Sequence, residues 1–308
     1  MPGPGKWIRG YRFIKGEGKR DKGKMPENKH ILLAVLAHPD DETFGMGGTL
    51  ALYARRGVEV HLICATRGEV GSVDPQFLQG FESIGERRES ELCCAADLLG
   101  LAGVHFLGYR DSGMPGSPDN HHPDALAAQP VDEVASKVAH YLRKLRPQVV
   151  VTNDPIGGYK HPDHIAVHRA TLRAFTLAAD PAFKDDLPSF KPDKLYYNIF
   201  PKGFLKIALL ALPLLGQDPH HFGRNKDIDL VEIVRDGDFP VHARINYSPV
   251  STLKDQASAC HASQLAGGPP NRGPLRWVNK LVGSYDTYMR AIPRVEKRLH
   301  ERDLFEGI

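Results

Sequence analysis

Continuous apolar runs alternate with helical periodicity over about residues 31–178 of the chain. Each run has the length of a strand and lacks a polar–apolar alternation, as expected for strands that are buried on both faces. The predicted strands cover residues 31–37, 58–66, 103–108 and 148–153. Helices are predicted at residues 49–56, 82–99, 131–145 and 164–178. This order predicts an α/β fold with a Rossmann-like, mostly parallel sheet and helices on both faces.

The remainder of the chain has a less regular pattern. Strands are expected at residues 194–200 and 241–247, and helices at residues 249–264 and 277–300. Between them, residues 203–233 form a long insertion with an apolar first half and a polar second half. Long insertions in compact domains often serve as lids or binding loops. We therefore expect a smaller, irregular C-terminal part beside the sheet.

The charge balance and the apolar runs limit the kinds of partner. Forty Lys and Arg residues against 37 Asp and Glu residues give a formal charge of +3. Dedicated nucleic-acid binders usually carry a strongly basic domain, so no nucleic-acid partner is expected. The longest apolar run, residues 207–215, contains a proline and falls short of the roughly 18–20 residues of a membrane span. We expect no stable membrane insertion, and a homo-oligomer remains compatible with the sequence.

The cysteines show no metal-binding or disulfide framework. The four cysteines are Cys64, Cys93, Cys94 and Cys260, and no two of them have C-x-x-C spacing. Most lie among apolar residues, which is typical of reduced cysteines in a protein core. The pattern predicts four free thiols and a cytoplasmic location.

Ionisable side chains gather where two predicted strands end. The sequence HPDDE (38–42) follows the first strand, and NDPIGGYKHPDH (153–164) follows a later one. The carboxyl ends of parallel strands meet at one edge of the sheet, where ligands bind in open α/β folds. Imidazoles and carboxylates that leave one position open are the ligands of a catalytic zinc, and a further carboxylate can act as the base. Either motif alone also fits a turn with a helix N-cap; the two together predict a metal site.

Other polar clusters receive simpler interpretations. The glycines of GMGG (45–48) superficially suggest a phosphate loop, but HPDDE would put negative charge where a pyrophosphate should lie. Close strand–helix packing explains these glycines as well. Glu42 is interpreted as a charge at a helix start without a chemical role. Two histidine pairs lie in turn-rich loops and are not expected to bind metal: His121 with His122, and His220 with His221.

The motifs also resemble a known family. AHPDDE (37–42) together with HPDH (161–164) is similar to the signature pair of the PIG-L/LmbE-like zinc-dependent N-acetylglucosaminyl deacetylases. The likeness extends over about residues 30–270 and includes TRGEVG (66–71) and ERRESEL (86–92). FLGYRDSGM (106–114) and GGYKHPDH (157–164) most resemble the members that act in mycothiol metabolism, the deacetylase and the S-conjugate amidase.

The resemblance implies a role for ten residues. The implied metal ligands are His38, Asp41 and His164, for Zn²⁺, with Fe²⁺ also fitting the two imidazoles and one carboxylate. Asp40 is the implied general base. His161 is implied to be a protonated partner that stabilises the oxyanion or protonates the leaving amine, with Asp163 holding its ring. Tyr159 is implied to donate a hydrogen bond to the oxyanion. The implied substrate-binding residues are Arg88, Asp111 and His261.

The expected function is metal-dependent hydrolysis of the N-acetyl group of an N-acetylglucosamine-type sugar conjugate, a small-molecule substrate. One alternative is an amidase that acts on mycothiol S-conjugates, and another is a deacetylase of a different acetylated amino sugar. More distant alternatives are a non-catalytic protein with this fold and a dinucleotide-binding Rossmann protein. An assay for bound metal separates the enzyme from the non-catalytic protein.

Three parts of the chain are predicted. Residues 1–29 are rich in basic residues and glycine and lack the apolar segment of a signal peptide, which predicts a flexible basic arm. Residues 30–180 form the predicted Rossmann-like metal-binding core. Residues 181–308, with the insertion at 203–233, are expected to complete the substrate pocket as part of the same domain or as a subdomain.

Overall fold

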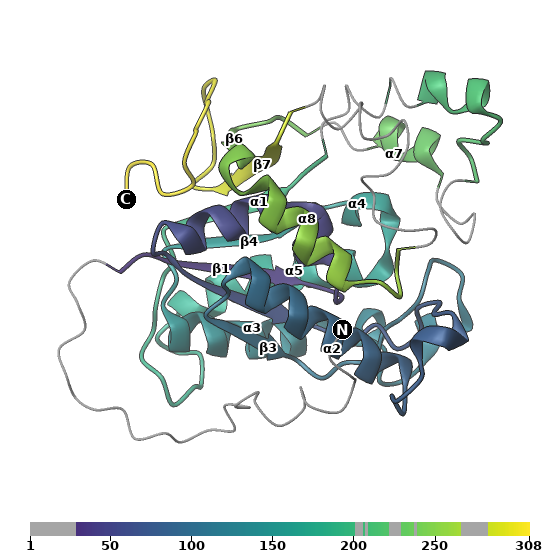
Figure 1. Cartoon of the computed structure of the whole chain (residues 1–308). Helices are drawn as coiled ribbons and strands as arrows, with labels where there is room; N and C mark the ends of the chain where they lie inside the picture. Colours follow the sequence, from purple (N-terminus) through teal and green to yellow (C-terminus); the bar gives the residue numbers. More distant parts are fainter. Residues whose placement is uncertain (1–28, 201–205, 207–208, 222–228, 237–238, 266–282) are drawn as a thin grey trace.

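The computed structural model describes residues 29–200, 206, 209–221, 229–236, 239–265 and 283–308. Its centre is a seven-stranded sheet with the strand order β3-β2-β1-β4-β5-β7-β6 (Figure 1). The strands are β1 (Ile31–Leu36), β2 (Glu59–Cys64), β3 (Gly103–Phe106), β4 (Val149–Asn153), β5 (Lys194–Asn198), β6 (Ala243–Asn246) and β7 (Tyr285–Ile292). The first five strands pair in parallel, and β7 pairs antiparallel with both β5 and β6.

The apolar runs form strands because both faces of the sheet are covered. Successive side chains of β1 enter opposite cores: Leu32, Ala34 and Leu36 belong to one apolar cluster, and Leu33 and Val35 to the other. All five of these side chains are buried. Because neither face of this strand is exposed to solvent, polar and apolar residues do not alternate along it, which accounts for the continuous apolar run.

Helices cover the two faces. The helices α1 (Asp41–Arg55), α2 (Ile84–Leu99) and α8 (Ser251–Cys260) contribute to one core, and α3 (Val131–Leu145) and α5 (Pro162–Ala179) contribute to the other. Two shorter helices are α4 (Gly157–Lys160) and α7 (Leu230–Asp236). The 3₁₀ turns are η1 (Pro75–Phe77), η2 (Pro118–His121), η3 (Leu126–Ala128), η4 (Pro213–Leu215) and η5 (Ser248–Val250). The predicted α/β class with a mostly parallel sheet is confirmed.

One element was assigned to the wrong class. The helix predicted at residues 277–300 is wrong where the structure describes it, because residues 285–292 form β7. This strand is inserted between β5 and β6, so its conformation is set by two antiparallel partners that are distant in sequence. Local periodicity does not report such pairing. Helix α1 also begins earlier than predicted, at Asp41, so Asp41 and Glu42 lie in its first turn and Asp40 directly precedes it.

Several predictions about the chain's organisation remain open. Residues 1–28 of the predicted arm and parts of the 203–233 insertion (203–205, 207–208 and 222–228) lie outside the described residues. Strands from both predicted parts, 30–180 and 181–308, belong to one continuous sheet. Among the described helices, none combines the length and the apolar character that a membrane crossing needs.

The prediction of four reduced cysteines is wrong for one pair. Cys94 and Cys260 form a disulfide, although 166 residues separate them, while Cys64 and Cys93 take no part in a disulfide. The packing of α2 against α8 brings the pair together. Such a contact between distant segments leaves no trace in cysteine spacing. The cytoplasmic location, which rested on reduced cysteines, loses that support and stays a prediction.

Candidate metal centre and active site

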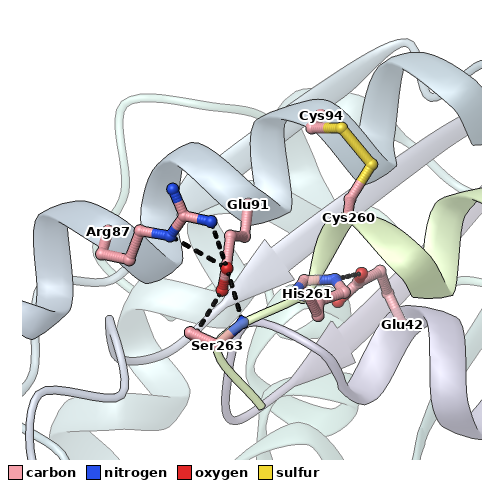
Figure 2. The surroundings of a disulfide bond; sticks show 7 residues. All are labelled: Glu42, Arg87, Glu91, Cys94, Cys260, His261 and Ser263. Atoms are coloured by element: carbon pink, nitrogen blue, oxygen red, sulfur yellow. Dashed lines mark hydrogen bonds and ion pairs between the residues drawn. A yellow bond between two sulfur atoms is a disulfide. The ribbon is translucent and has the colours of Figure 1, made fainter. Parts of the chain in front are cut away.

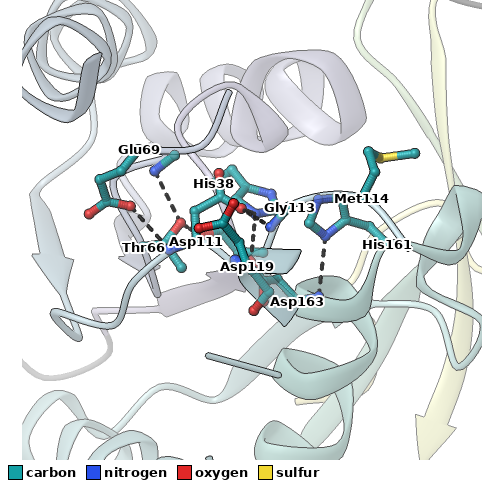
Figure 3. A network of polar contacts seen from close by, with 12 residues as sticks. His38, Thr66, Glu69, Asp111, Gly113, Met114, Asp119, His161 and Asp163 are labelled. Atoms are coloured by element: carbon teal, nitrogen blue, oxygen red, sulfur yellow. Dashed lines mark hydrogen bonds and ion pairs between the residues drawn. The ribbon is translucent and has the colours of Figure 1, made fainter. Parts of the chain in front are cut away.

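The ionisable residues predicted from the two motifs converge at the carboxyl edge of the parallel strands. His38 follows β1, Asp111 follows β3, and His161 lies between α4 and α5 beyond the end of β4. Figure 3 shows the Asp111 and Asp163 side chains beside His38, with His161 next to them. The loops that follow parallel strands all point to one side, so segments that are far apart in sequence meet here.

His38, Asp41 and His164 form a compact triangle of side chains, which we call the donor triangle. Nδ1 of His38 lies 3.2 Å from Nε2 of His164 and 3.8 Å from Oδ2 of Asp41, and Nε2 of His164 lies 3.3 Å from Oδ1 of Asp41. Ligands about 2.1 Å from a tetrahedral metal ion are about 3.4 Å apart. The spacing of this donor set therefore fits a zinc-sized cation.

Two further donor groups overlap with this triangle at His38. The ligand atoms of His38, His161 and His164 lie within 4.8 Å of one another, and so do those of His38, Asp111, His161 and Asp163. Although burial opposes it, the carboxylates of Asp111, Asp163 and Asp41 raise the pKa of His38 well above its usual value. This excess of carboxylates around one imidazole favours a cation at the centre of the cluster.

Asp163 holds a different histidine from the one predicted. Its carboxylate accepts a hydrogen bond from Nε2 of His38 at 3.0 Å, whereas its backbone N–H donates to Nδ1 of the His161 ring at 3.2 Å. The backbone N–H of Ser112, at 2.9 Å, and the Ser112 hydroxyl both donate to the buried Asp163 carboxylate. Asp163 therefore fixes the ring of His38 and leaves Nδ1 of that ring facing His164 and Asp41.

Asp40 lies beside the triangle in an unusual backbone conformation. Its φ of 118° lies in the region that favours glycine, so the conformation must be imposed by its surroundings. The backbone N–H of Asp40 donates to Oε2 of Glu42 at 2.9 Å, and Nη2 of Arg88 donates to Oδ2 of Asp40 at 3.1 Å. Burial raises the pKa of Asp40 to about 6, against the positive charge of Arg88, and Asp41 adds to the rise.

Arg88 lies behind Asp40 and is directed at the protein rather than at solvent. Besides Asp40, it donates to the carbonyl oxygens of Pro39 at 2.7 Å and Gly68 at 3.1 Å. A Cβ atom at Gly68 would lie 2.0 Å from Nη1 of Arg88, so the glycine makes room for the guanidinium. The contact between Arg88 and a sugar stays a prediction. The residue restrains the Asp40 loop.

Asp111 is also buried, and it lies against His38. Its Oδ1 is 3.6 Å from Nε2 of His38 and accepts the Gly113 N–H at 2.8 Å. Although burial opposes it, His38 lowers the pKa of Asp111. The backbone N–H of Asp111 donates to Glu69 at 3.1 Å. Glu69 was not among the predicted site residues, although the TRGEVG motif contains it.

Tyr159 and His161 complete one wall of the cluster. The ring centre of Tyr159 lies 5.2 Å from that of His164 and 5.8 Å from that of His161. Burial raises the pKa of Tyr159 well above its usual value, so its hydroxyl keeps its proton. Burial, together with His38 and His164, lowers the pKa of His161, which disfavours the protonated form predicted from the sequence. Because Nδ1 accepts a hydrogen bond, a neutral His161 carries its proton on Nε2.

His261 and Glu42 form a buried pair that sequence analysis interpreted differently. Nε2 of His261 lies 2.6 Å from Oε1 of Glu42, and both side chains are fully buried. His261 was predicted to bind substrate and Glu42 to have no chemical role. The pair instead reaches Asp40 through the second oxygen of Glu42. No local signal marks it, because 219 residues separate the partners.

The loop histidines belong to neither of the two donor groups found among the described residues. His121 ends the turn η2, and Nδ1 of His122 accepts the Asp124 N–H at 3.1 Å within the same loop. His220 pairs with Asp229, and His221 pairs with Asp218, both at exposed positions.

Close packing explains Gly48 of the GMGG sequence, because a Cβ atom there would lie 2.1 Å from Cγ of Tyr247.

Comparison with known proteins gives a consistent picture. Residues 33–175 match the PIG-L family, described as GlcNAc-PI de-N-acetylase. A protein of Streptomyces scabiei named 1D-myo-inositol 2-acetamido-2-deoxy-alpha-D-glucopyranoside deacetylase is 37% identical over 96% of this chain and 95% of its own length. A Thermobifida fusca protein of the same name is 40% identical over 78% of this chain and 85% of its own.

Solved structures share the fold. The N,N'-diacetylchitobiose deacetylase from Pyrococcus horikoshii superposes with a TM-score of 0.58 and 22% identity, over 84% of this chain and 83% of its own. A conserved protein from Thermus thermophilus, TT1542, gives a TM-score of 0.56 and 24% identity, over 86% of this chain and 96% of its own. With sequence identity to the two deacetylases spanning most of the chain, and with both signature motifs meeting in one cluster, this protein belongs to the PIG-L family.

Proposed function

We propose that this protein is a metal-dependent deacetylase that removes the acetyl group from an N-acetylglucosamine-type sugar conjugate. The observation that carries the proposal is the His38–Asp41–His164 triangle, whose donor spacing fits a small divalent cation, with the Asp40 carboxylate beside it. The relatives that match most of the chain are named as deacetylases of a glucosaminyl-inositol, which supports a small sugar conjugate as substrate.

His38, Asp41 and His164 would hold the metal, and Zn²⁺ or Fe²⁺ fits two imidazoles and one carboxylate. When bound, such an ion supplies Lewis-acid polarisation of the amide carbonyl and makes water more acidic. Although burial opposes it, His164 and His38 lower the pKa of Asp41, so this ligand is ionised at neutral pH.

Asp40 acts as the general base. Its pKa of about 6 leaves it mostly ionised at neutral pH and still close enough to be protonated during turnover. It takes a proton from the attacking water, whose oxygen bonds to the carbonyl carbon. The same proton then passes to the sugar nitrogen as the C–N bond breaks, giving acetate and a free amine.

Tyr159 and His161 serve as hydrogen-bond donors to the oxygen that gains negative charge. The Tyr159 hydroxyl keeps its proton, and the neutral His161 ring presents Nε2–H. Donors fixed in a buried site stabilise developing charge without reorganising, which is worth about 10²–10³ in kcat for a single donor. Asp163 and Arg88 position His38 and Asp40 respectively.

A panel of substrates tests the proposed reaction. Purified protein is assayed for release of free amine from N-acetylglucosaminyl-inositol, from N,N'-diacetylchitobiose and from a mycothiol S-conjugate. We expect the first compound to give the highest kcat/KM. A preference for the S-conjugate would indicate the amidase instead. Failure to hydrolyse any amide, by protein that contains metal, would contradict the proposed function.

A further inference from the structure

A short segment at the end of α8, residues 260–263, is bonded to two separate parts of the active-site support (Figure 2). We call this segment the 260–263 strap. Cys260 is disulfide-bonded to Cys94 of α2, and His261 is bonded to Glu42 at the start of α1. The backbone N–H and the hydroxyl of Ser263 donate to Glu91 of α2, at 2.9 and 2.7 Å. Three of its four residues thus make long-range bonds.

The contact with Glu42 leads directly to Asp40. Oε1 of Glu42 is bonded to Nε2 of His261 at 2.6 Å, and Oε2 accepts the backbone N–H of Asp40 at 2.9 Å. Glu42 therefore connects the strap to the residue whose φ is 118°. A backbone in this region holds its shape only while the surrounding contacts persist.

Helix α2 restrains the same loop from the other side. Arg88 donates to the Pro39 carbonyl and to the Asp40 carboxylate. Glu91, one turn further along α2, holds Ser263. Helix α2 is therefore the common support for both restraints on Asp40: Arg88 acts directly, and the strap acts through Glu42. The disulfide is the covalent part of the second connection.

The disulfide and the contact it supports differ in exposure. The side chain of Cys94 is exposed and that of Cys260 is half-buried. Glu42 and His261 are fully buried. A small dithiol can therefore reach the disulfide without disturbing the pair directly. In that exchange a thiolate attacks one sulfur, a mixed disulfide forms, and the second thiol of the reagent releases it. Two electrons and two protons pass from the reagent, giving two cysteine thiols and a cyclic disulfide.

We infer that the 260–263 strap is a redox-sensitive positioning element, in which the Cys94–Cys260 disulfide keeps His261 on Glu42 and thereby fixes Asp40. This rests on the proposed function, since Asp40 is its base. Glu42 and His261 are fully buried and act as positioning residues. Reduction leaves the metal ligands in place and loosens the base, so it lowers turnover more than substrate binding.

Kinetics of the oxidised and the dithiothreitol-reduced protein test this inference. Reduction should lower kcat by up to about 10²-fold, the scale of a 1 Å misplacement of a catalytic group, with KM and metal content little changed. A Cys94→Ala/Cys260→Ala variant should show the lower kcat under both conditions. Cys93→Ala, which leaves the disulfide intact, should respond to the reductant as the unaltered protein does. Equal kcat in the oxidised and reduced protein would overturn the inference.

Amide hydrogen exchange gives a readout that does not depend on activity. Reduction should speed exchange in a peptide covering residues 38–44, because the Asp40 N–H loses its fixed partner, while a peptide from α3 stays protected. His261→Ala should reproduce this change in oxidised protein, and His261→Gln, which keeps a donor, should restore protection in part. Unchanged exchange on reduction would contradict the inference about the strap. Faster exchange on reduction, in a protein that hydrolyses no amide, would support that inference and contradict the proposed function.

Discussion

Nε2 of His38 lies 3.0 Å from Oδ2 of Asp163, and this contact turns the opposite nitrogen of the same ring toward His164 and Asp41. The Asp163 carboxylate is itself fully buried and held by Ser112. A histidine whose second nitrogen donates to a carboxylate is fixed in tautomer and orientation. Asp163 therefore supports the donor triangle from outside it.

Replacing Asp163 with Ala should weaken metal binding by about 10–100-fold, the usual effect of removing a partner of a metal-bound histidine. Competition with a chelator of known affinity measures the effect. Asp119→Ala is the matched control, because that carboxylate contacts Arg110 at the loop and does not reach His38. If the Asp163 variant bound metal as tightly as the control, the supporting role of Asp163 would be wrong.

Asp40 and His164 should fail in different ways. Asp40→Asn should lower kcat by about 10²–10⁴-fold, the range for loss of a general acid–base, while metal content stays unchanged. His164→Ala should lose the metal together with activity, because it removes one corner of the triangle. Elemental analysis and kinetics on both variants separate the roles. Equal loss of metal from both proteins would contradict the division between base and ligand.

The acid side of the pH profile should report Asp40. Burial raises its pKa to about 6 in the protein without metal, and a bound cation favours the carboxylate and lowers that value. The apparent pKa of the acid limb should therefore be about 6 or lower. Since only the ionised form of Asp40 is a base, kcat/KM should fall about tenfold for each pH unit below that pKa.

Substitution of Arg88 should shift the acid limb of the pH profile of kcat/KM. Its positive charge lowers the pKa of Asp40, so Arg88→Met should move the acid limb to higher pH. Arg88→Lys keeps the charge and should leave the limb nearer its original position. An acid limb that moved to lower pH in the Met variant would show that another group controls it.

Gly48 and Tyr247 should be coupled in stability. A Cβ atom at Gly48 would lie 2.1 Å from Cγ of Tyr247, so Gly48→Ala forces the ring to move and should cost about 1–3 kcal/mol of the free energy of unfolding. The same substitution in a Tyr247→Ala background should cost less, because the clash is gone. Denaturant unfolding of the four proteins gives the coupling, and additive effects would argue against close packing.

The parts of the fold that could be predicted depend on local signals. The β1 strand is a continuous apolar run because both of its faces are buried, and the HPDDE motif follows it directly. The topology of a parallel sheet then brings His38 and His164 to one edge. The prediction of strands, of the edge and of the clustering of these residues needed nothing beyond sequence order.

The parts that could not be predicted depend on contacts between distant segments. Strand β7 owes its conformation to β5 and β6, so its local pattern was mistaken for a helix. The Cys94–Cys260 disulfide and the His261–Glu42 pair join residues 166 and 219 positions apart. Asp163 was assigned to the nearby His161, whereas its carboxylate bonds to His38, 125 residues away. Sequence proximity is a poor guide to the partner of a buried side chain.

Metal dependence of amine release is the most direct test of the proposed reaction. The protein is purified without added metal, its metal content is determined by elemental analysis, and activity on N-acetylglucosaminyl-inositol is measured before and after treatment with a chelator. We expect about one Zn²⁺ or Fe²⁺ per chain, loss of activity with the metal, and recovery when one equivalent is restored. Full activity in protein that contains no metal would contradict the proposal.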